Sequence, residues 1–131
     1  MRDRARDKGR LHDIIEHSEN VTSFVSGQTF EDFNADKLTY YAVMKNIEII
    51  GEAAFMLTDA FKDAHSTTPW HAVQGMRHVL VHDYANIDPQ ELYNTAVNDM
   101  TPLRNQVRQY LAETDWQEWE RTKVNEFNDN Q

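Results

Sequence analysis

One segment of the chain, Ile47-Glu48-Ile49-Ile50-Gly51-Glu52-Ala53-Ala54-Phe55-Met56-Leu57, is apolar around most of a helical turn. Its three isoleucines point in different directions on an α-helix. The helix that contains them, expected from about Asn34 or Asp36 to Ala64, should therefore lie in the middle of a bundle. Gly51 inside that helix costs about 1 kcal/mol relative to alanine. We expect another backbone to approach the helix closely there.

Apolar residues recur at helical spacing in three other parts of the chain. They predict further main helices at residues 3–26, 70–82 and 89–111. Between the first two helices, residues 28–33 are expected to form a linker in which Thr29 is a helix cap. Thr68 is expected to cap the third helix, with Pro69 at its first position.

The last main helix has a strong start and an interrupted middle. Asp88 is expected to cap it, Pro89 to occupy its first position and Glu91 to reach back toward the cap. Pro102 lies inside the apolar pattern and is expected to kink or break this helix after Met100.

The composition agrees with a single helical domain. The chain has 131 residues, is 40% hydrophobic and 27% charged, and contains only four glycines and three prolines. So few turn-forming residues argue against an all-β fold. We predict an all-α, antiparallel four- to five-helix bundle at residues 1–112. Residues 113–131 are predicted to form an acidic C-terminal extension, with a short amphipathic turn through Trp116 and Trp119.

The formal net charge of −9 argues against broad, sequence-independent duplex binding. The charge is uneven, because residues 1–10 hold five basic and two acidic groups, whereas residues 113–131 hold six acidic and two basic groups. Two interpretations remain possible, namely a solvated surface with charged ends and a small cationic site on an acidic body.

The chain has no cysteine, no apolar signal segment and no run near the roughly 18 apolar residues of a membrane span. We expect a cytoplasmic protein with no membrane partner.

The third helix contains the residues whose side chains are candidates for binding or catalysis. Arg77 falls within the apolar arc that Trp70, Val73 and Leu80 define, although a guanidinium is rarely buried without a partner. The partner is open between a carboxylate of another helix, a neighbouring subunit and a bound anion. A core salt bridge and a phosphate-binding site are therefore both possible interpretations of Arg77.

Three histidines, His71, His78 and His82, form one stripe on the flank of the same helix. His78 and His82 have the i, i+4 spacing of a metal pair, but the glutamate of a His-Glu-x-x-His motif is absent, and no metal or other cofactor is predicted. Arg77 and His82 are about 140° apart around an ideal helix. They can meet if the helix unwinds near His82, or if a cleft brings both to one ligand.

The string Arg77-His78-Val79-Leu80-Val81-His82-Asp83-Tyr84 resembles the signature of the HEPN superfamily, which is arginine, four residues, histidine, any residue and tyrosine. His78 stands where that family usually has another polar residue, often asparagine. The most similar branch is the HepT-like toxin of MNT–HEPN toxin–antitoxin modules. The resemblance extends over residues 2–112 through four further strings, Phe30-Glu31-Asp32-Phe33, Ile49-Ile50-Gly51-Glu52-Ala53-Ala54, Pro69-Trp70 with Gly75-Met76-Arg77, and Met100-Thr101-Pro102-Leu103.

This resemblance implies a homodimer whose Arg and His line a cleft between the subunits, and a metal-independent endoribonuclease that acts on RNA. It also implies a minimal nucleotidyltransferase antitoxin, which silences the toxin by adding AMP to the motif tyrosine. Arg77 would then hold the scissile phosphate, and His82 would be the general base or acid of 2′-hydroxyl attack. Tyr84 would bind substrate and accept AMP.

Three neighbouring residues, His78, Asp83 and Glu52, are assigned supporting roles at the same site. Asp83 is a candidate to tune His82, although it also fits an ordinary helix end. Glu52 is a candidate to orient Arg77 or His82, but its spacing favours a surface ladder with Lys45 and Glu48. As an alternative to the enzyme, the chain would be a non-catalytic HEPN protein that binds nucleotide or accepts AMP from a nucleotidyltransferase.

Overall fold

A computed structural model of the chain describes residues 2–129, with side chains described as far as Thr122. Within these residues there are eight α-helices, two short 3-10 helices and no strand, as the all-α prediction requires. No helix in this range combines the length and the apolar character of a membrane span. The helices are α1 (Asp7–Val25), α2 (Phe30–Ala35), α3 (Lys37–Met56), α4 (Asp59–Ala64), α5 (Trp70–His82), α6 (Pro89–Asn98), α7 (Met100–Glu113) and α8 (Trp116–Asp129), with 3-10 helices η1 (Arg4–Arg6) and η2 (Tyr84–Asn86).

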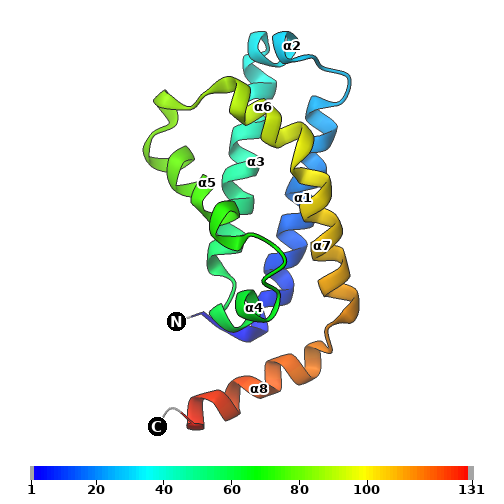
Figure 1. Ribbon diagram of the computed structural model, residues 1–131, viewed down its shortest axis with the longest axis vertical. Helices are drawn as coiled ribbons and strands as arrows, with labels where there is room; N and C mark the ends of the chain where they lie inside the picture. The colour runs from blue at the N-terminus through cyan, green and yellow to red at the C-terminus, as the bar shows by residue number, and fades with distance from the viewer. Residues whose placement is uncertain (1, 130–131) are drawn as a thin grey trace.

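The bundle is antiparallel, and α3 lies in its middle as predicted. Figure 1 shows α1, α3, α5 and the α6–α7 pair alternating in direction, with α5 leaning out from the side of α3. Helix α3 packs against both α1 and α5, and α7 closes the other side of α1. The shared core is apolar, and its fully buried side chains include Leu11, Ile14, Val21, Phe33, Val43, Ala54, Leu57, Phe61 and Val107.

Two boundaries around α3 differ from the prediction. The expected long helix ends at Met56, because Thr58 caps the separate helix α4 by accepting a hydrogen bond from the Phe61 amide. The expected linker at residues 28–33 is mostly the short helix α2. Thr29 caps it as predicted, in a capping box with Asp32.

The predicted cap of α5 and the predicted break near Pro102 are also corrected. Thr68 does not cap α5, because its hydroxyl is hydrogen bonded to Gln106 and Tyr110 of α7 instead. The last main helix is divided into α6 and α7 at Asp99, before Met100 rather than after it. Pro102 then lies in the first turn of α7, where its missing N–H leaves no intrahelical bond unmade.

The C-terminal extension forms the helix α8, which lies across the end of the bundle where α1 begins (Figure 1). Asp7 is fully buried and accepts hydrogen bonds from the Thr58 amide (2.9 Å), the Thr58 hydroxyl (2.7 Å) and the Trp119 indole N–H (3.0 Å). The buried Arg4 guanidinium stacks on the Trp119 ring, 3.8 Å from its centroid, and donates to the Trp119 carbonyl. The start of the chain is thus fixed to the α3–α4 junction and to α8.

We predict that Asp7→Ala lowers the free energy of unfolding by about 3 kcal/mol, because three buried donors lose their acceptor. Urea unfolding monitored by tryptophan fluorescence measures the change. Asp63→Ala removes the same charge from an exposed position on α4 and should change stability by no more than about 0.5 kcal/mol. Equal losses in the two variants would show that the Asp7 hydrogen bonds carry no special weight.

Candidate functional site

The site begins with the contact between Gly51 of α3 and Arg77 of α5. A Cβ on Gly51 would lie 2.7 Å from the Arg77 Cβ and 3.0 Å from the Arg77 backbone nitrogen. No side chain fits in that space, so the glycine lets the two helices approach each other. The expected close approach at Gly51 is therefore confirmed, and the approaching backbone belongs to the candidate catalytic residue itself.

The guanidinium of Arg77 is fixed by two neighbours of Gly51 on α3. Its Nε donates to the Oε2 of Glu52, and its Cζ lies 4.8 Å from the centroid of the Phe55 ring. The side chain of Arg77 remains 30% exposed. Among the groups that the structure describes, neither of its two Nη groups has a hydrogen-bond partner. Those two nitrogens are the ones that can grip an anion in bidentate fashion.

Glu52 therefore acts differently from the favoured sequence interpretation. Lys45 pairs with Glu48 at 3.5 Å on the surface of α3. Glu52 does not extend this surface pair and instead pairs across the helix interface with Arg77. Phe55 was not expected at the site. Its signal in the sequence was its position one helical turn after Gly51 and Glu52, which places all three on one face of α3.

The C-terminal end of α5 presents the other predicted residues to solvent. His78, His82, Asp83 and Tyr84 are all exposed, Tyr84 to 62%. The His78 and His82 rings lie with their centroids 4.7 Å apart. Within the part of the chain that the structure describes, no third histidine, cysteine or carboxylate joins them into a metal-binding group. Asp83 accepts a hydrogen bond from Asn86 at 2.7 Å and so stabilises the turn after the helix.

Arg77 and His82 do not meet within one chain. Helix α5 is regular through His82, and the Asp83 amide still donates to the Val79 carbonyl at 2.9 Å. The helix end thus does not unwind before His82, which was one of the two ways considered for the pair to meet. The guanidinium faces α3, whereas the imidazole lies about 140° around the helix. One chain therefore presents the two halves of the motif on different sides.

The exposed side of α5 contains small and apolar residues of the kind that pack against another helix. Gly75 and His78 lie on it, and Val79 and Val81 are 47% and 43% exposed. No heavy atom of the described chain beyond the helix itself would meet a Cβ on Gly75 within 4 Å. The fold of one chain thus gives no reason for this glycine, in contrast to Gly51.

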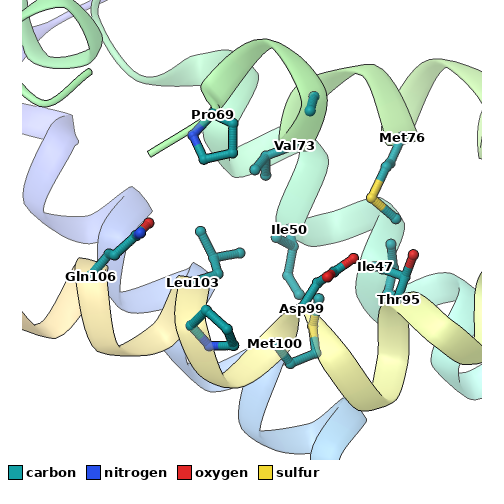
Figure 2. Close-up of a pocket in the computed structure, with 12 residues that line it drawn as sticks. Ile47, Ile50, Pro69, Val73, Met76, Thr95, Asp99, Met100, Leu103 and Gln106 are labelled. Carbon is teal, nitrogen blue, oxygen red and sulfur yellow. The ribbon is translucent and has the colours of Figure 1, made fainter. Parts of the chain in front are cut away.

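An apolar cavity of about 360 Å³ lies elsewhere, between α3, α5 and the α6–α7 pair. Figure 2 shows Val73 and Met76 of α5 facing Met100 and Leu103 of α7 across it. Arg77, His82 and the other predicted site residues do not line it. The cavity is therefore separate from the candidate site, which lies at the surface.

Comparison with known proteins decides the family. The model of the family described as "Ribonuclease HepT-like" matches residues 14–110, which is most of the chain. The chain belongs to this family. Among HepT-like relatives, a protein of Caldanaerobacter subterraneus subsp. tengcongensis named "Putative RNase" is 34% identical over 77% of this chain and 90% of its own length. A "Probable ribonuclease HepT" of Thermococcus cleftensis is 38% identical over 74% of this chain and 88% of its own.

A third relative, from Methanocaldococcus jannaschii and also named "Putative RNase", is 31% identical over 76% of this chain and 92% of its own length. No solved structure matches the chain significantly. The family resemblance stated from the sequence is thus confirmed, and membership places the chain among enzymes of the ribonuclease class.

We predict that Gly51→Ala lowers the free energy of unfolding by about 2 kcal/mol, because the added methyl must push α5 away from α3. Chemical unfolding measures the loss. Gly9→Ala is the matched control, because a Cβ there meets nothing within 4 Å, and it should leave stability unchanged or raise it by up to about 1 kcal/mol. If both variants behave alike, the close contact at Arg77 does not constrain the helix pair.

Proposed function

We propose that this chain is a cytoplasmic, metal-independent endoribonuclease toxin of an MNT–HEPN toxin–antitoxin module, which uses Arg77 and His82 on RNA as a homodimer. The observation that carries the proposal is the state of Arg77. Its Nε is held by Glu52 while both Nη groups make no bond to the described chain. An arginine that served only a core salt bridge would be expected to direct more of its donors inward.

In this mechanism Arg77 grips two oxygens of the scissile phosphate through its Nη groups and stabilises the charge that develops there. Glu52 is a positioning residue, because it fixes the plane of the guanidinium without touching RNA. The ring of Phe55 supports the same guanidinium from one side. The anion-binding fork is thus oriented before substrate arrives, which lowers the entropic cost of reaching the transition state.

His82 removes the proton from the 2′-hydroxyl, whose oxygen attacks the adjacent phosphorus. The bond between phosphorus and the 5′-oxygen then breaks, and a protonated imidazole donates a proton to that oxygen. The products are a 2′,3′-cyclic phosphate and a free 5′-hydroxyl. The exposed His78 lies beside His82 and binds substrate there.

A second copy of the chain completes the site. Arg77 and His82 of one chain lie on different sides of α5, so one phosphodiester is reached most simply by Arg77 of one protomer and His82 of its partner. The exposed face around Gly75 and Val79 supports this arrangement, since small and apolar residues permit close helix packing. On an ideal helix, His82 lies within about 60° of Gly75 and Val79, whereas Arg77 lies about 160° from them and about 40° from Val81, which is at the other edge of the exposed side.

Tyr84 is the proposed AMP acceptor for a partner nucleotidyltransferase. It follows α5 in the turn η2 and is 62% exposed, so a transferase can reach its hydroxyl. The hydroxyl oxygen attacks the α-phosphorus of ATP, pyrophosphate leaves, and the phenolic proton passes to a base. The added phosphodiester would place a negative charge and an adenosine beside the cleft and block RNA.

We predict that the purified protein cleaves single-stranded RNA in EDTA, and that an all-deoxy strand of the same sequence stays intact. Arg77→Ala should lower kcat/KM by about 10²–10³-fold, and His82→Ala should reduce cleavage to background. Gel analysis of end-labelled RNA measures the rates and identifies the cyclic phosphate. Failure of the wild type to cleave any RNA, together with AMP incorporation, would favour the non-catalytic, AMP-accepting alternative.

Mixing the two inactive variants tests the composite site. If Arg77 of one protomer works with His82 of its partner, a heterodimer of Arg77→Ala and His82→Ala chains contains one intact site. An equal mixture should then regain roughly a quarter of wild-type activity. A site formed within one chain would regain none, and that result would refute the shared arrangement.

We predict that the cognate nucleotidyltransferase, supplied with ATP, increases the intact mass of this chain by whole AMP units and abolishes RNA cleavage. Tyr84→Phe should take up no AMP at that position and should stay active in the presence of the transferase, because its ring keeps its place without the acceptor oxygen. An unchanged mass shift in Tyr84→Phe would place the modification elsewhere.

A further inference from the structure

Two arginines lie over the ring of Phe55, one from the start of the chain and one from α5. The Cζ of Arg77 lies 4.8 Å from its ring centroid, and the Cζ of Arg2 lies 4.5 Å from the same centroid. The two guanidinium carbons are therefore separated by at most the sum of these distances, about 9 Å. The basic start of the chain, which the mechanism above does not use, is thus brought next to the candidate site.

The surrounding contacts fix Arg2 in this position. Arg4 is stacked on Trp119, and Asp7 is hydrogen bonded to Thr58, so the chain on the C-terminal side of Arg2 is tied to α8 and to the α3–α4 junction. Arg2 itself pairs with Asp59 at 3.6 Å. Its side chain keeps 30% exposure, the same fraction as Arg77, and so can meet a ligand from solvent.

An open pocket of about 530 Å³ adjoins this arginine and is lined by Arg2, Phe55, Met56, Thr58 and Asp59. Pockets of this size accept small organic ligands, so a nucleotide unit is within its range. Lys62 lies beside the pocket and pairs with Asp59 at 3.8 Å. Burial lowers the pKa of Lys62, and the positive charge of Arg2 lowers it further. Arg2 thus contributes a positive field that reaches its neighbours.

We propose that Arg2, with Phe55 and the pocket beside them, forms a second phosphate subsite that binds the nucleotide next to the scissile phosphate on the same RNA strand. The proposal rests on the function proposed above and extends it. Phe55 is the shared support, because one ring holds both guanidinium groups at a separation that neighbouring backbone phosphates can span. Arg77 acts on the bond that is cut, whereas Arg2 contributes only to binding.

The subsite also gives the acidic chain a place for a polyanion. The formal net charge of −9 opposes RNA binding over most of the surface. At Phe55, two arginines and nearby Lys62 gather in one place, beside the carboxylates of Glu52 and Asp59 that pair with them and of Asp7 and Asp63, which act on Lys62. The Asp59 carboxylate is 81% exposed and so can turn to water when a phosphate takes its place on Arg2. Asp59 is therefore a competitor of RNA rather than part of its site.

The test measures binding and cleavage in parallel. Binding is followed by the fluorescence anisotropy of a labelled single-stranded oligodeoxynucleotide, which has the phosphates but no 2′-hydroxyl for the reaction. Arg2→Ala should weaken binding about 5–10-fold and reduce the slope of log affinity against log salt by about 0.7, the value for one lost phosphate contact on a single strand. On RNA, the variant should raise KM with little change in kcat. Arg6→Ala, which removes the same charge from an exposed position on η1, is the matched control and should weaken binding about twofold or less.

Asp59→Asn distinguishes a binding role from a structural one. It removes the competitor and should tighten oligonucleotide binding, the opposite of Arg2→Ala. If the Arg2–Asp59 pair only stabilised the start of the chain, the two variants would lower the melting temperature alike and would shift affinity in the same direction. That result, or equal effects of Arg2→Ala and Arg6→Ala on affinity and salt slope, would overturn the subsite while wild-type cleavage of RNA still supported the proposed function. A wild type that neither binds nor cleaves would overturn both.

Discussion

The close contact between Gly51 and Arg77 determines the rest of the site. Because the glycine has no side chain, α5 rests directly on α3 at the residue that carries the candidate catalytic charge. The next residues on that face of α3, Glu52 and Phe55, then meet the guanidinium from two directions. The contact between α3 and α5 therefore also sets the position of the Arg77 guanidinium, and a change in one would change the other.

Pairing with Glu52 orients Arg77 without satisfying all of its donors. A free arginine on an acidic protein would sample many rotamers and lose that freedom on binding, whereas the bond at Nε leaves the outer fork already aligned. The cost is partial neutralisation, since a carboxylate beside a phosphate opposes its binding. A second cation on the same Phe55 ring offsets this charge, and the arrangement ties the basic start of the chain to the same site.

The sequence predicts the fold class, the central position of α3 and the close approach at Gly51, because these follow from helical periodicity and the cost of a buried glycine. It misses the break at Thr58, where tertiary hydrogen bonds and a local cap interrupt an otherwise continuous apolar pattern, and it places the break between α6 and α7 after Met100 rather than at Asp99. For Glu52 the sequence offers both a surface ladder and a role in orienting Arg77, and it favours the ladder, since spacing along one helix cannot reveal a partner on another. Arg104 is a second example. Like Arg77, it falls among apolar residues at helical spacing in the sequence. In the structure it lies on the buried face of α7 and donates to the hydroxyls of Ser18, Thr22 and Thr101. Only the arrangement of donors in space distinguishes a structural arginine from one that can bind an anion.

Nitrogen-15 NMR of the Arg77 guanidinium can show whether the ion pair with Glu52 orients the arginine, with the signal assigned by its loss in Arg77→Lys. In the free protein, the Nε–H resonance should be sharp and protected from exchange, because Glu52 accepts its proton, while the Nη signals should be averaged by rotation. On addition of a single-stranded oligodeoxynucleotide, we expect the Nε–H resonance to stay in place and separate, protected Nη–H signals to emerge. Loss of the Nε–H resonance, or Nη signals that do not respond to the oligonucleotide, would contradict the claim that one ion pair orients this arginine toward a phosphate.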